Sequence, residues 1–402
     1  MILAGSLLFL LAFVISLIGT GLAKRFAQRL GLMDDPGHRK VHTVATPRNG
    51  GIGIFWGFAL PLLAGIAAVP FLQSHVTVHL PIDWVFTGAP ATEYSLRVFH
   101  VNVARIPEVI VDNLPGMRAQ IPLALLFLGA AFLIHLLGLL DDRKPMRPWP
   151  KLLAQLAIAA ALVGISECLP HGTLRVLTFL GNFPSPGFFI SLLLSILWIV
   201  ALTNAFNFLD HMDGLSAGVA FLCAAAFLIA AVFNQQYFVI ALLLLFMGSV
   251  LGFLFFNFPP ATIFMGDGGS MLLGFILSVL TIRTTYFDAS HPLAQHHWYA
   301  VFMPLFVMAV PLYDLSIVSV LRLMKGRSPM TGDTNHFSHR LTRHGFSKRG
   351  AVLLIYGVTL ATGFSAPLLA RVDDASALLL AGQLLAVLIV IAVLERVGEH
   401  TQ

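Results

Sequence analysis

Charge is scarce in this chain. Only 11% of its 402 residues are Asp, Glu, Lys or Arg, whereas soluble globular domains carry about 25%. At the same time, 57% of the residues are hydrophobic, which argues against an ordinary water-facing surface. We therefore expect an all-α, polytopic membrane protein.

Cysteine is almost absent as well. Cys168 and Cys223 each lie in or beside an apolar run, and their spacing favours neither a metal site nor a disulfide. The net charge of +5 indicates positively charged cytoplasmic loops and gives no reason to expect nucleic acid as a partner. The first apolar run lacks a basic leader and a small-residue cleavage site, so we interpret it as a retained helix and not as a cleaved signal.

Long apolar runs are what the sequence does contain. Eleven of them come near the roughly twenty residues that span a bilayer, and ten would remain without the shortest, 269–283. The runs are 2–20, 51–73, 120–140, 151–168, 187–206, 214–233, 236–256, 269–283, 298–321, 350–370 and 376–395. We interpret the chain as a single transmembrane domain over residues 1–402, with its termini on opposite sides of the membrane.

Basic residues are unevenly divided between the two sets of loops. One set, with the C-terminal tail, holds 18 of the 24 Lys and Arg residues, so the positive-inside rule assigns it to the cytoplasm. This places the N-terminus outside and the C-terminus inside. It also predicts a cytoplasmic substrate-binding loop at 322–349 and an external loop or small subdomain at 74–118, in which residues 93–103 alternate like a strand.

Aspartates gather on the same predicted side. Eight of the fourteen lie there, namely Asp34, Asp35, Asp141, Asp142, Asp210, Asp213, Asp267 and Asp333. The charge rule concerns Lys and Arg, so another cause is needed, and a metal and phosphate site would supply one. Asp141 and Asp142 also oppose the helix dipole at the end of run 120–140, which favours a functional role over a simple ion-paired helix end.

The densest polar stretch is T-N-A-F-N-F-L-D-H-M-D-G, at the end of an apolar run. Five polar residues occur within ten positions: Asn204, Asn207, Asp210, His211 and Asp213. On a helix, Asn204, Asn207 and His211 share a face, and Asp213 joins them only if the helix breaks near Asp213-Gly214. A capped, solvated helix end would explain one or two of these residues, so we favour a site at the membrane boundary.

Asp267 lies on a turn rich in glycine, I-F-M-G-D-G-G-S. We expect Ser270 to cap the following helix and Asp267 to be a metal ligand, with a plain capping acid as the alternative. Phe264, beside the turn, either packs against lipid or core, or stacks on a base.

Basic residues recur in the last large loop and the first. His336, His339 and Arg340 are spaced i, i+3 and i+4, which on a helix forms a diphosphate clamp, while a zinc site lacks a third ligand. In the first loop, Thr46 and Arg48 belong to T-P-R-N-G-G, which suits either a substrate anion or lipid head groups. We interpret Asp314, within run 298–321, as a structural residue that holds a neighbouring helix.

Together these motifs resemble the polyprenyl-phosphate N-acetylhexosamine-1-phosphate transferases (glycosyltransferase family 4). N-A-F-N-F-L-D-H-M-D-G-L, the D-D pair, N-F-P-P-A-T-I-F-M-G-D-G-G-S and D-T-N-H-F-S-H-R-L carry the resemblance, which is nearer to the WecA/TagO-like branch than to MraY. His211 stands where that family usually has Gly or Asn, and Ser338 where His is common. Segment 74–118 is longer than the family's usual loop.

The resemblance implies a reaction in which a UDP-HexNAc, with GlcNAc first in line, gives its sugar 1-phosphate to undecaprenyl phosphate and releases UMP. It implies Mg²⁺ as the cofactor, with Mn²⁺ as an alternative. It also implies that the protein lies in the bacterial cytoplasmic membrane with its active site facing the cytoplasm. The reaction would be the first membrane step of a cell-envelope glycan pathway, such as that of lipopolysaccharide or teichoic acid. A homodimer is one oligomeric form to expect. A phospho-MurNAc-pentapeptide donor is the alternative within the enzyme class.

By the same resemblance, Asn207 and Asp267 would hold the metal, and Asp141 or Asp142 would deprotonate or orient the lipid phosphate. Asp213 and Phe264 would bind uracil. The remaining substrate contacts would come from Asn204, Asp210, His336, His339, Arg340, Thr46 and Arg48.

A secondary transporter or a lipid flippase is the alternative from another class. A transporter would place its polar residues at the middle of the membrane on broken, repeated helices. Here they lie at one predicted face, and the sequence shows no internal repeat.

Overall fold

The computed structural model describes residues 2–34, 45–79, 93–98, 101–105, 108–177, 186–284, 298–326, 328 and 336–397. The long helices are α1 (Ile2–Leu30), α2 (Gly51–His75), α4 (Glu108–Arg143), α5 (Pro148–Ser166), α6 (Pro186–Leu209), α7 (Leu215–Phe233), α8 (Tyr237–Asn257), α9 (Asp267–Arg283), α11 (Ala309–Met324), α13 (Lys348–Gly363) and α14 (Asp374–Val397). The shorter elements are η3 (Trp298–Phe302), α10 (Met303–Val307), α12 (Phe337–Arg343), η4 (Ala366–Ala370), β1 (Met33–Asp34), β2 (Thr46–Pro47), β3 (Val76–His79), β4 (Glu93–Val98) and β5 (Val101–Arg105).

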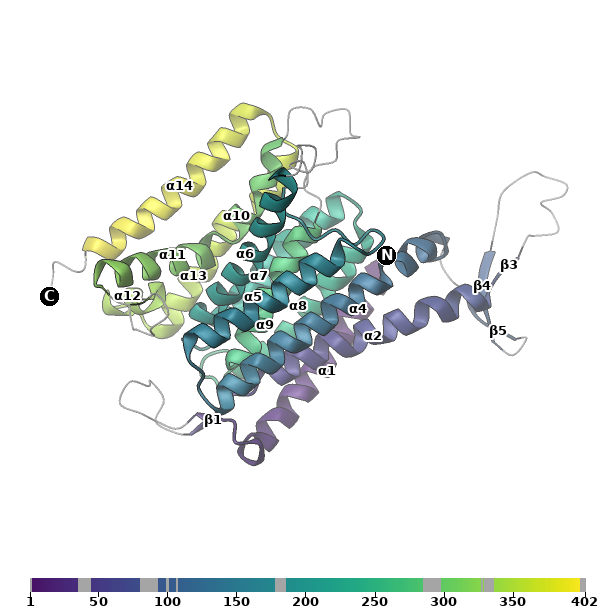
Figure 1. Cartoon of the computed structure of the whole chain (residues 1–402), viewed down its shortest axis with the longest axis horizontal. Helices are drawn as coiled ribbons and strands as arrows, with labels where there is room; N and C mark the ends of the chain where they lie inside the picture. The colour runs from purple at the N-terminus through teal and green to yellow at the C-terminus, as the bar shows by residue number, and fades with distance from the viewer. Residues whose placement is uncertain are drawn as a thin grey trace.

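The predicted fold class is confirmed, because the chain is a bundle of apolar helices with little strand (Figure 1). Within the described ranges, nine helices are long and apolar enough to cross a membrane, or ten if the bent pair ending in α11 counts as one span. Helix α9 takes the place of the remaining predicted run and has 17 residues. The orientation of the bundle across the membrane stays a prediction.

Helix α9 lies at the centre of the bundle, where it packs against α2, α4, α6, α7 and α8. All of its residues from Gly268 to Thr281 are buried. Its neighbours therefore shield it from lipid, and its N-terminal end marks one end of the protein core.

Glycines let the neighbours of α9 come close to its backbone. A Cβ on Gly138 of α4 would lie 2.4 Å from the carbonyl oxygen of Asp267, and one on Gly274 of α9 would lie 2.2 Å from the carbonyl oxygen of Leu202 in α6. Backbone atoms cannot yield to such contacts as a flexible side chain can. The ends of α4, α6 and α9 are thus held in fixed relative positions.

Run 298–321 was expected to be one helix, but α10 and α11 meet at a bend of 70°. Pro311 lies four residues after Val307, the last residue of α10. A proline ring clashes with the carbonyl group four residues earlier and removes a hydrogen bond, which explains the break at Met308.

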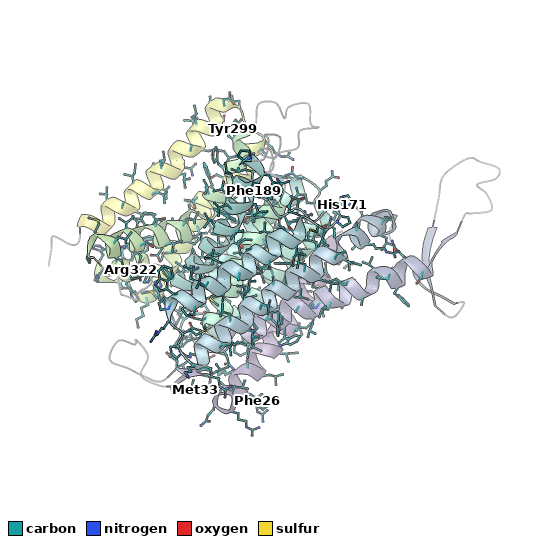
Figure 2. The ribbon with its side chains drawn as sticks, viewed as in Figure 1. Phe26, Met33, His171, Phe189, Tyr299 and Arg322 are labelled. Atoms are coloured by element: carbon teal, nitrogen blue, oxygen red, sulfur yellow. The ribbon has the colours of Figure 1, made fainter. Side chains whose placement is uncertain are left out.

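The two ends of the bundle differ. Strands β3, β4 and β5 form an antiparallel sheet, which bears out the strand pattern expected near 93–103, and this sheet lies at one end of the molecule while β1 and α12 lie toward the other (Figure 1). Figure 2 shows Met33 and Arg322 toward the β1 end and His171 and Tyr299 away from it. The residues of the predicted site lie at the β1 end.

Candidate functional site

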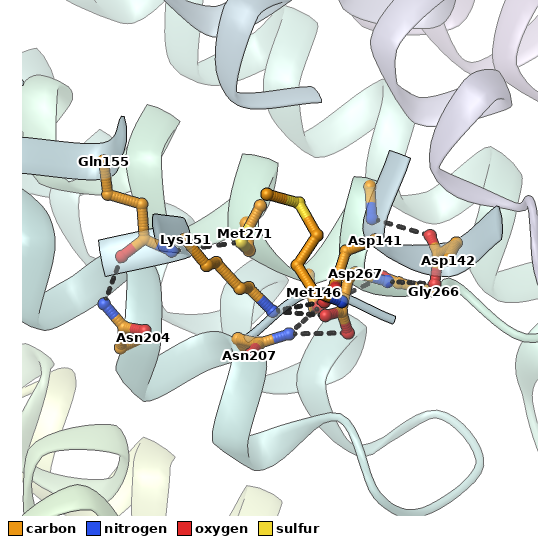
Figure 3. Close-up of polar contacts among 12 residues, drawn as sticks. Asp141, Asp142, Met146, Lys151, Gln155, Asn204, Asn207, Gly266, Asp267 and Met271 are labelled. Atoms are coloured by element: carbon orange, nitrogen blue, oxygen red, sulfur yellow. Dashed lines mark hydrogen bonds and ion pairs between the residues drawn. The ribbon is translucent and has the colours of Figure 1, made fainter. Parts of the chain in front are cut away.

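Four helix ends converge to form what we name the acid cluster (Figure 3). Asp141 and Asp142 come from the end of α4, Lys151 from the start of α5, Asn207 from the end of α6 and Asp267 from the start of α9. The expectation that acids far apart in sequence share one face is thus met for these residues. Asp35 and Asp333 lie outside the described residues.

Lys151 lies between two carboxylates of the acid cluster. Its ammonium group donates to Asp141 Oδ2 at 2.9 Å and to Asp267 Oδ2, and its side chain is 15% exposed. From the sequence, Lys151 was only one of the 18 basic residues of the predicted cytoplasmic set. A cation at the first position of the apolar run 151–168 is the signal that could have identified it, because such a charge needs a partner near the membrane.

Asp142 caps α9. The backbone N–H groups of Asp267 and Gly268 each donate to one of its carboxylate oxygens at 2.9 Å, and it is buried. A negative charge is unfavourable at the C-terminus of a helix and favourable at the N-terminus. Asp142 therefore opposes the dipole of α4 but is stabilised by the dipole of α9. The expectation that Ser270 caps this helix was wrong: its hydroxyl donates to Gly266 O at 3.0 Å, inside the first turn.

The amide groups of α6 connect three helices. Asn207 Nδ2 donates to Asp267 Oδ1 at 3.0 Å and to Ser270 Oγ at 2.9 Å, so the two predicted metal ligands are in contact. Asn204 Nδ2 donates to Gln155 Oε1 of α5 at 2.6 Å. The predicted substrate contact of Asn204 is untested, and in this structure its amide joins α6 to α5.

The segment after α6 turns earlier than expected. The helix ends at Leu209, four residues before the predicted break, and Gly214 takes a φ of +74° that suits glycine. Asp213 accepts the Ala261 N–H at 3.0 Å. Burial raises the pKa of Asp210 well above the usual range, and the nearby negative charges of Asp267, Asp142 and Asp213 raise it further.

Beside this turn lies what we name the histidine cluster: His211, Asp314, His336, Ser338 and His339. The His211 ring stacks on His336 with centroids 4.4 Å apart, and its centroid is 4.8 Å from that of His339. His336 Nδ1 donates to Asp314 Oδ2 at 2.8 Å, and the Phe337 N–H donates to Asp314 Oδ1 at 2.7 Å. Asp314 therefore fixes the start of α12, as its predicted structural role required.

The two positions that depart from the resembling family are in contact. His211 Nε2 and Ser338 Oγ lie 2.5 Å apart, and His211 Nδ1 lies 2.7 Å from Phe208 O. Burial and the neighbouring His336 lower the pKa of His211 to about 3. Desolvation by burial also lowers the pKa of His339, and the neighbouring His336 and Arg343 lower it further.

The helical spacing expected for the diphosphate clamp holds only in part. Helix α12 begins at Phe337, and His336 has extended backbone angles before it, so His336 does not share a helical face with His339 and Arg340. Arg340 is buried, at 4% exposed. The two imidazoles nevertheless lie on the same His211 ring.

The first loop reaches the glycine-rich turn through backbone contacts. Thr46 lies in β2, and the Phe264 N–H donates to Pro47 O at 2.7 Å. Arg48 lies 3.6 Å from Asp34 in a partly exposed ion pair. The structure thus joins the loop that holds Thr46 and Arg48 to the turn that precedes Asp267, while the basic residues at 39–42 lie outside the described residues.

The oxygen donors of the acid cluster fit a magnesium ion. Among the described residues, no group of three or more His, Cys, Asp or Glu is arranged to hold a metal. Mg²⁺ does not need one, because it uses one or two carboxylates and completes its shell with water and substrate phosphate. Asp267, 32% exposed and in contact with Asn207, would be the carboxylate in such a site.

Comparison with known proteins gives a consistent result. The family model described as "Glycosyl transferase family 4" matches residues 124–285, which include all of the acid cluster. A "Probable undecaprenyl-phosphate N-acetylglucosaminyl 1-phosphate transferase" of Bacillus subtilis is 29% identical over 352 residues, covering 86% of this chain and 80% of that protein.

Two further relatives carry related names. A "Decaprenyl-phosphate N-acetylglucosaminephosphotransferase" of Mycobacterium tuberculosis is 31% identical over 370 residues, covering 86% of this chain and 78% of that protein. An "Undecaprenyl-phosphate alpha-N-acetylglucosaminyl 1-phosphate transferase" of Escherichia coli is 27% identical over 341 residues, covering 83% and 75%.

Proposed function

Because the chain belongs to glycosyl transferase family 4, among the polyprenyl-phosphate N-acetylhexosamine-1-phosphate transferases, we propose that it transfers GlcNAc 1-phosphate from UDP-GlcNAc to undecaprenyl phosphate and releases UMP. The relatives' names supply the sugar phosphate and the lipid phosphate. The observation that carries the proposal is the convergence of the acid cluster and the histidine cluster at one end of a membrane bundle.

The reaction exchanges one phosphoanhydride bond for another. An oxygen of the lipid phosphate attacks the phosphorus that carries the sugar, and the bond from this phosphorus to the bridging oxygen of UMP breaks. A lipid diphosphate sugar and UMP result. Such phosphoryl transfer asks the protein mainly to position the groups in line and to neutralise their charge.

The acid cluster would hold the cations that neutralise the charge of the phosphate groups. Asp267 and Asn207 would hold Mg²⁺, which supplies positive charge to the donor diphosphate when bound. Lys151, already paired with Asp141, would orient the lipid phosphate through that pair. Asp142 keeps the first turn of α9 in place by its two backbone hydrogen bonds.

The turn after α6 would accept a proton from the lipid phosphate and bind the uracil of the donor. A raised pKa makes a carboxylate a stronger base, so Asp210, whose pKa is raised by burial and by the neighbouring carboxylates, would accept the last proton of the lipid phosphate. Asp213, which accepts the Ala261 N–H, and Phe264, three residues after Ala261, would bind uracil. His336 and His339 would donate to the diphosphate, and Arg340 would add positive charge behind them.

The site would face the cytoplasm of a bacterial inner membrane. The protein is a multi-pass membrane protein by its apolar helices, and the acid cluster lies where α4 and α6 end and where α5 and α9 begin. The lipid phosphate would reach this level from the membrane while the nucleotide sugar arrives from water.

One assay tests the proposal. The purified protein is mixed with undecaprenyl phosphate, Mg²⁺ and a panel of UDP-sugars that includes UDP-MurNAc-pentapeptide, and UMP release is followed. We expect turnover with UDP-GlcNAc that EDTA abolishes and that Asp267→Ala reduces by about a thousandfold or more. The control is Asp373→Ala, which removes an exposed carboxylate that caps α14 through the Ser376 N–H.

The outcomes separate the parts of the proposal. No UMP from any UDP-HexNAc would contradict the transferase function. Turnover with the MurNAc-pentapeptide donor alone would replace GlcNAc as the sugar. Full activity of Asp267→Ala would remove only the metal assignment.

A further inference from the structure

His211 belongs to neither the acid cluster nor the residues assigned to substrate, yet it contacts three other members of the histidine cluster: His336, Ser338 and His339. It lies in the turn between α6 and α7, next to Asp210. It contacts α12 through a hydrogen bond with Ser338 and a ring contact with His339, and it stacks on His336, the residue before α12. A residue with these contacts can transmit the position of the turn to the helix.

The hydrogen bonds of His211 define its tautomer. Phe208 O can only accept, so Nδ1 at 2.7 Å carries the proton and donates. Burial keeps the ring neutral, which leaves Nε2 as an acceptor. The hydroxyl of Ser338, 2.5 Å away and fully buried, therefore donates to His211 Nε2.

The His336 imidazole is held from two sides, and the His339 imidazole also contacts His211. Asp314, itself 0% exposed, accepts from His336 Nδ1, and the His211 ring lies against His336 on another side. His339, in the first turn of α12, also lies beside the His211 ring. Neither imidazole can move away from the turn after α6 without breaking a contact with His211.

We infer that His211 and Ser338 form a tie between the turn after α6 and the first turn of α12, and that this tie holds the imidazoles of His336 and His339 in the position that binds the donor diphosphate. The inference rests on the proposed function for the identity of the donor. His211 is then a positioning residue. Groups held in place before a ligand arrives bind it more tightly, because less freedom is lost on binding.

The test removes each half of the tie. Ser338→Ala deletes the donor, and His211→Phe keeps a flat ring for stacking while it deletes both hydrogen bonds. At saturating undecaprenyl phosphate, we expect each variant to raise the KM for UDP-GlcNAc by about five- to tenfold with kcat within about twofold of wild type. The double variant should be no worse than either single one, since both delete the same bond.

Two variants guard against a general loss of structure. Thr342→Ala removes a hydroxyl of the same helix that donates to His339 O, one turn back, at 2.9 Å and has no hydrogen bond with His211 or Ser338 among the described residues, so it should leave the donor KM unchanged. His211→Gln keeps an amide oxygen that can accept from Ser338, so it should recover part of the wild-type KM. Thermal unfolding of each variant reports whether α12 remains folded.

A second measurement separates this inference from the function on which it rests. Binding of UDP-GlcNAc with Mg²⁺ but without lipid phosphate is measured by calorimetry, and we expect a five- to tenfold weaker Kd in Ser338→Ala. Transfer by the wild type with unchanged Kd and KM in both single variants would overturn the tie and keep the function. Weakened binding without UMP release by the wild type would support the tie and overturn the function.

The remaining outcomes are also decisive. Additive effects of His211→Phe and Ser338→Ala on the donor KM would show two separate contacts and overturn the tie. A wild-type protein that neither binds nor transfers UDP-GlcNAc would overturn the inference together with the function.

Discussion

The acid cluster and the histidine cluster lie side by side but are constructed differently. In the acid cluster, the backbones of α4 and α9 are in direct contact through Gly138, and the Asp142 carboxylate binds backbone N–H groups of α9. In the histidine cluster, the contacts are made between side chains. Asp314 is hydrogen-bonded to His336, just before α12, and His211 is hydrogen-bonded to Ser338 in the first turn of that helix.

This difference suggests how the two clusters respond to change. Backbone contacts at van der Waals distance leave no room for an added methyl group. A network of side chains can lose one hydrogen bond and keep its others, at a cost of about 0.5–1.5 kcal/mol. We therefore expect substitutions in the acid cluster to stop the reaction and substitutions in the histidine cluster to weaken donor binding.

The largest effect is expected for Lys151→Met. The variant leaves the Asp141 and Asp267 carboxylates facing each other without the ammonium group between them, and unpaired charges of this kind cost about 3–5 kcal/mol. We expect UMP release to fall by about a hundredfold or more. The matched variant, Lys151→Arg, keeps the charge and should retain more activity. Equal rates in Met and Arg variants would mean that the charge is not what matters at this position.

Gly138→Ala should have the next largest effect. The new Cβ would lie 2.4 Å from Asp267 O and from Gly268 Cα, so α4 and α9 must move apart. We expect the free energy of unfolding to fall by about 1–3 kcal/mol and activity to fall about tenfold, as thermal unfolding and UMP release would show.

Gly129→Ala is the control for this prediction. Gly129 lies on the same helix, and a Cβ added there would have no neighbouring atom within 4 Å. Alanine should therefore leave the free energy of unfolding unchanged or raise it by about 0.5–1 kcal/mol. Similar losses in both variants would show that α4 needs glycine for a reason other than contact with α9.

The convergence in the acid cluster could be predicted from sequence because it depends on topology. Alternating apolar runs place Asp141, Asn207 and Asp267 at the same membrane face, whatever the details of packing. Helix boundaries near Pro and Gly were also accessible, although the end of α6 at Leu209 was not, since local sequence offers no signal there except Asp210.

Contacts between side chains from different helices could not be predicted. Lys151 and Asp267 are 116 residues apart and Asp142 binds backbone groups 125 and 126 residues away. Nothing in the sequence around Asp142 distinguishes a capping acid for a distant helix from a catalytic one. His211 and Ser338 were each noticed separately, but their contact across 127 residues depends on how α12 folds back onto the turn after α6.

A smaller effect is expected for Asp314→Asn in the histidine cluster. Asparagine keeps the shape and can still accept from the Phe337 N–H, but it loses the charge that holds His336 Nδ1. We expect the KM for UDP-GlcNAc to rise about fivefold with kcat nearly unchanged, as steady-state rates of UMP release would show. A fall in kcat by a hundredfold would make this cluster as intolerant as the acid cluster and remove the contrast between them.

The smallest effect is expected in the first loop, which is joined to the glycine-rich turn by backbone hydrogen bonds. Arg48→Ala removes a partly exposed cation that we propose to contact substrate, and it should lower kcat/KM about two- to threefold. Its ion pair with Asp34, 3.6 Å long and partly exposed, is worth at most about 1 kcal/mol, so Asp34→Asn should leave both rate and stability nearly unchanged. If Asp34→Asn instead lowers kcat/KM as much as Arg48→Ala does, Arg48 acts by holding β1 and β2 together. The first loop would then support the acid cluster and not contact the substrate.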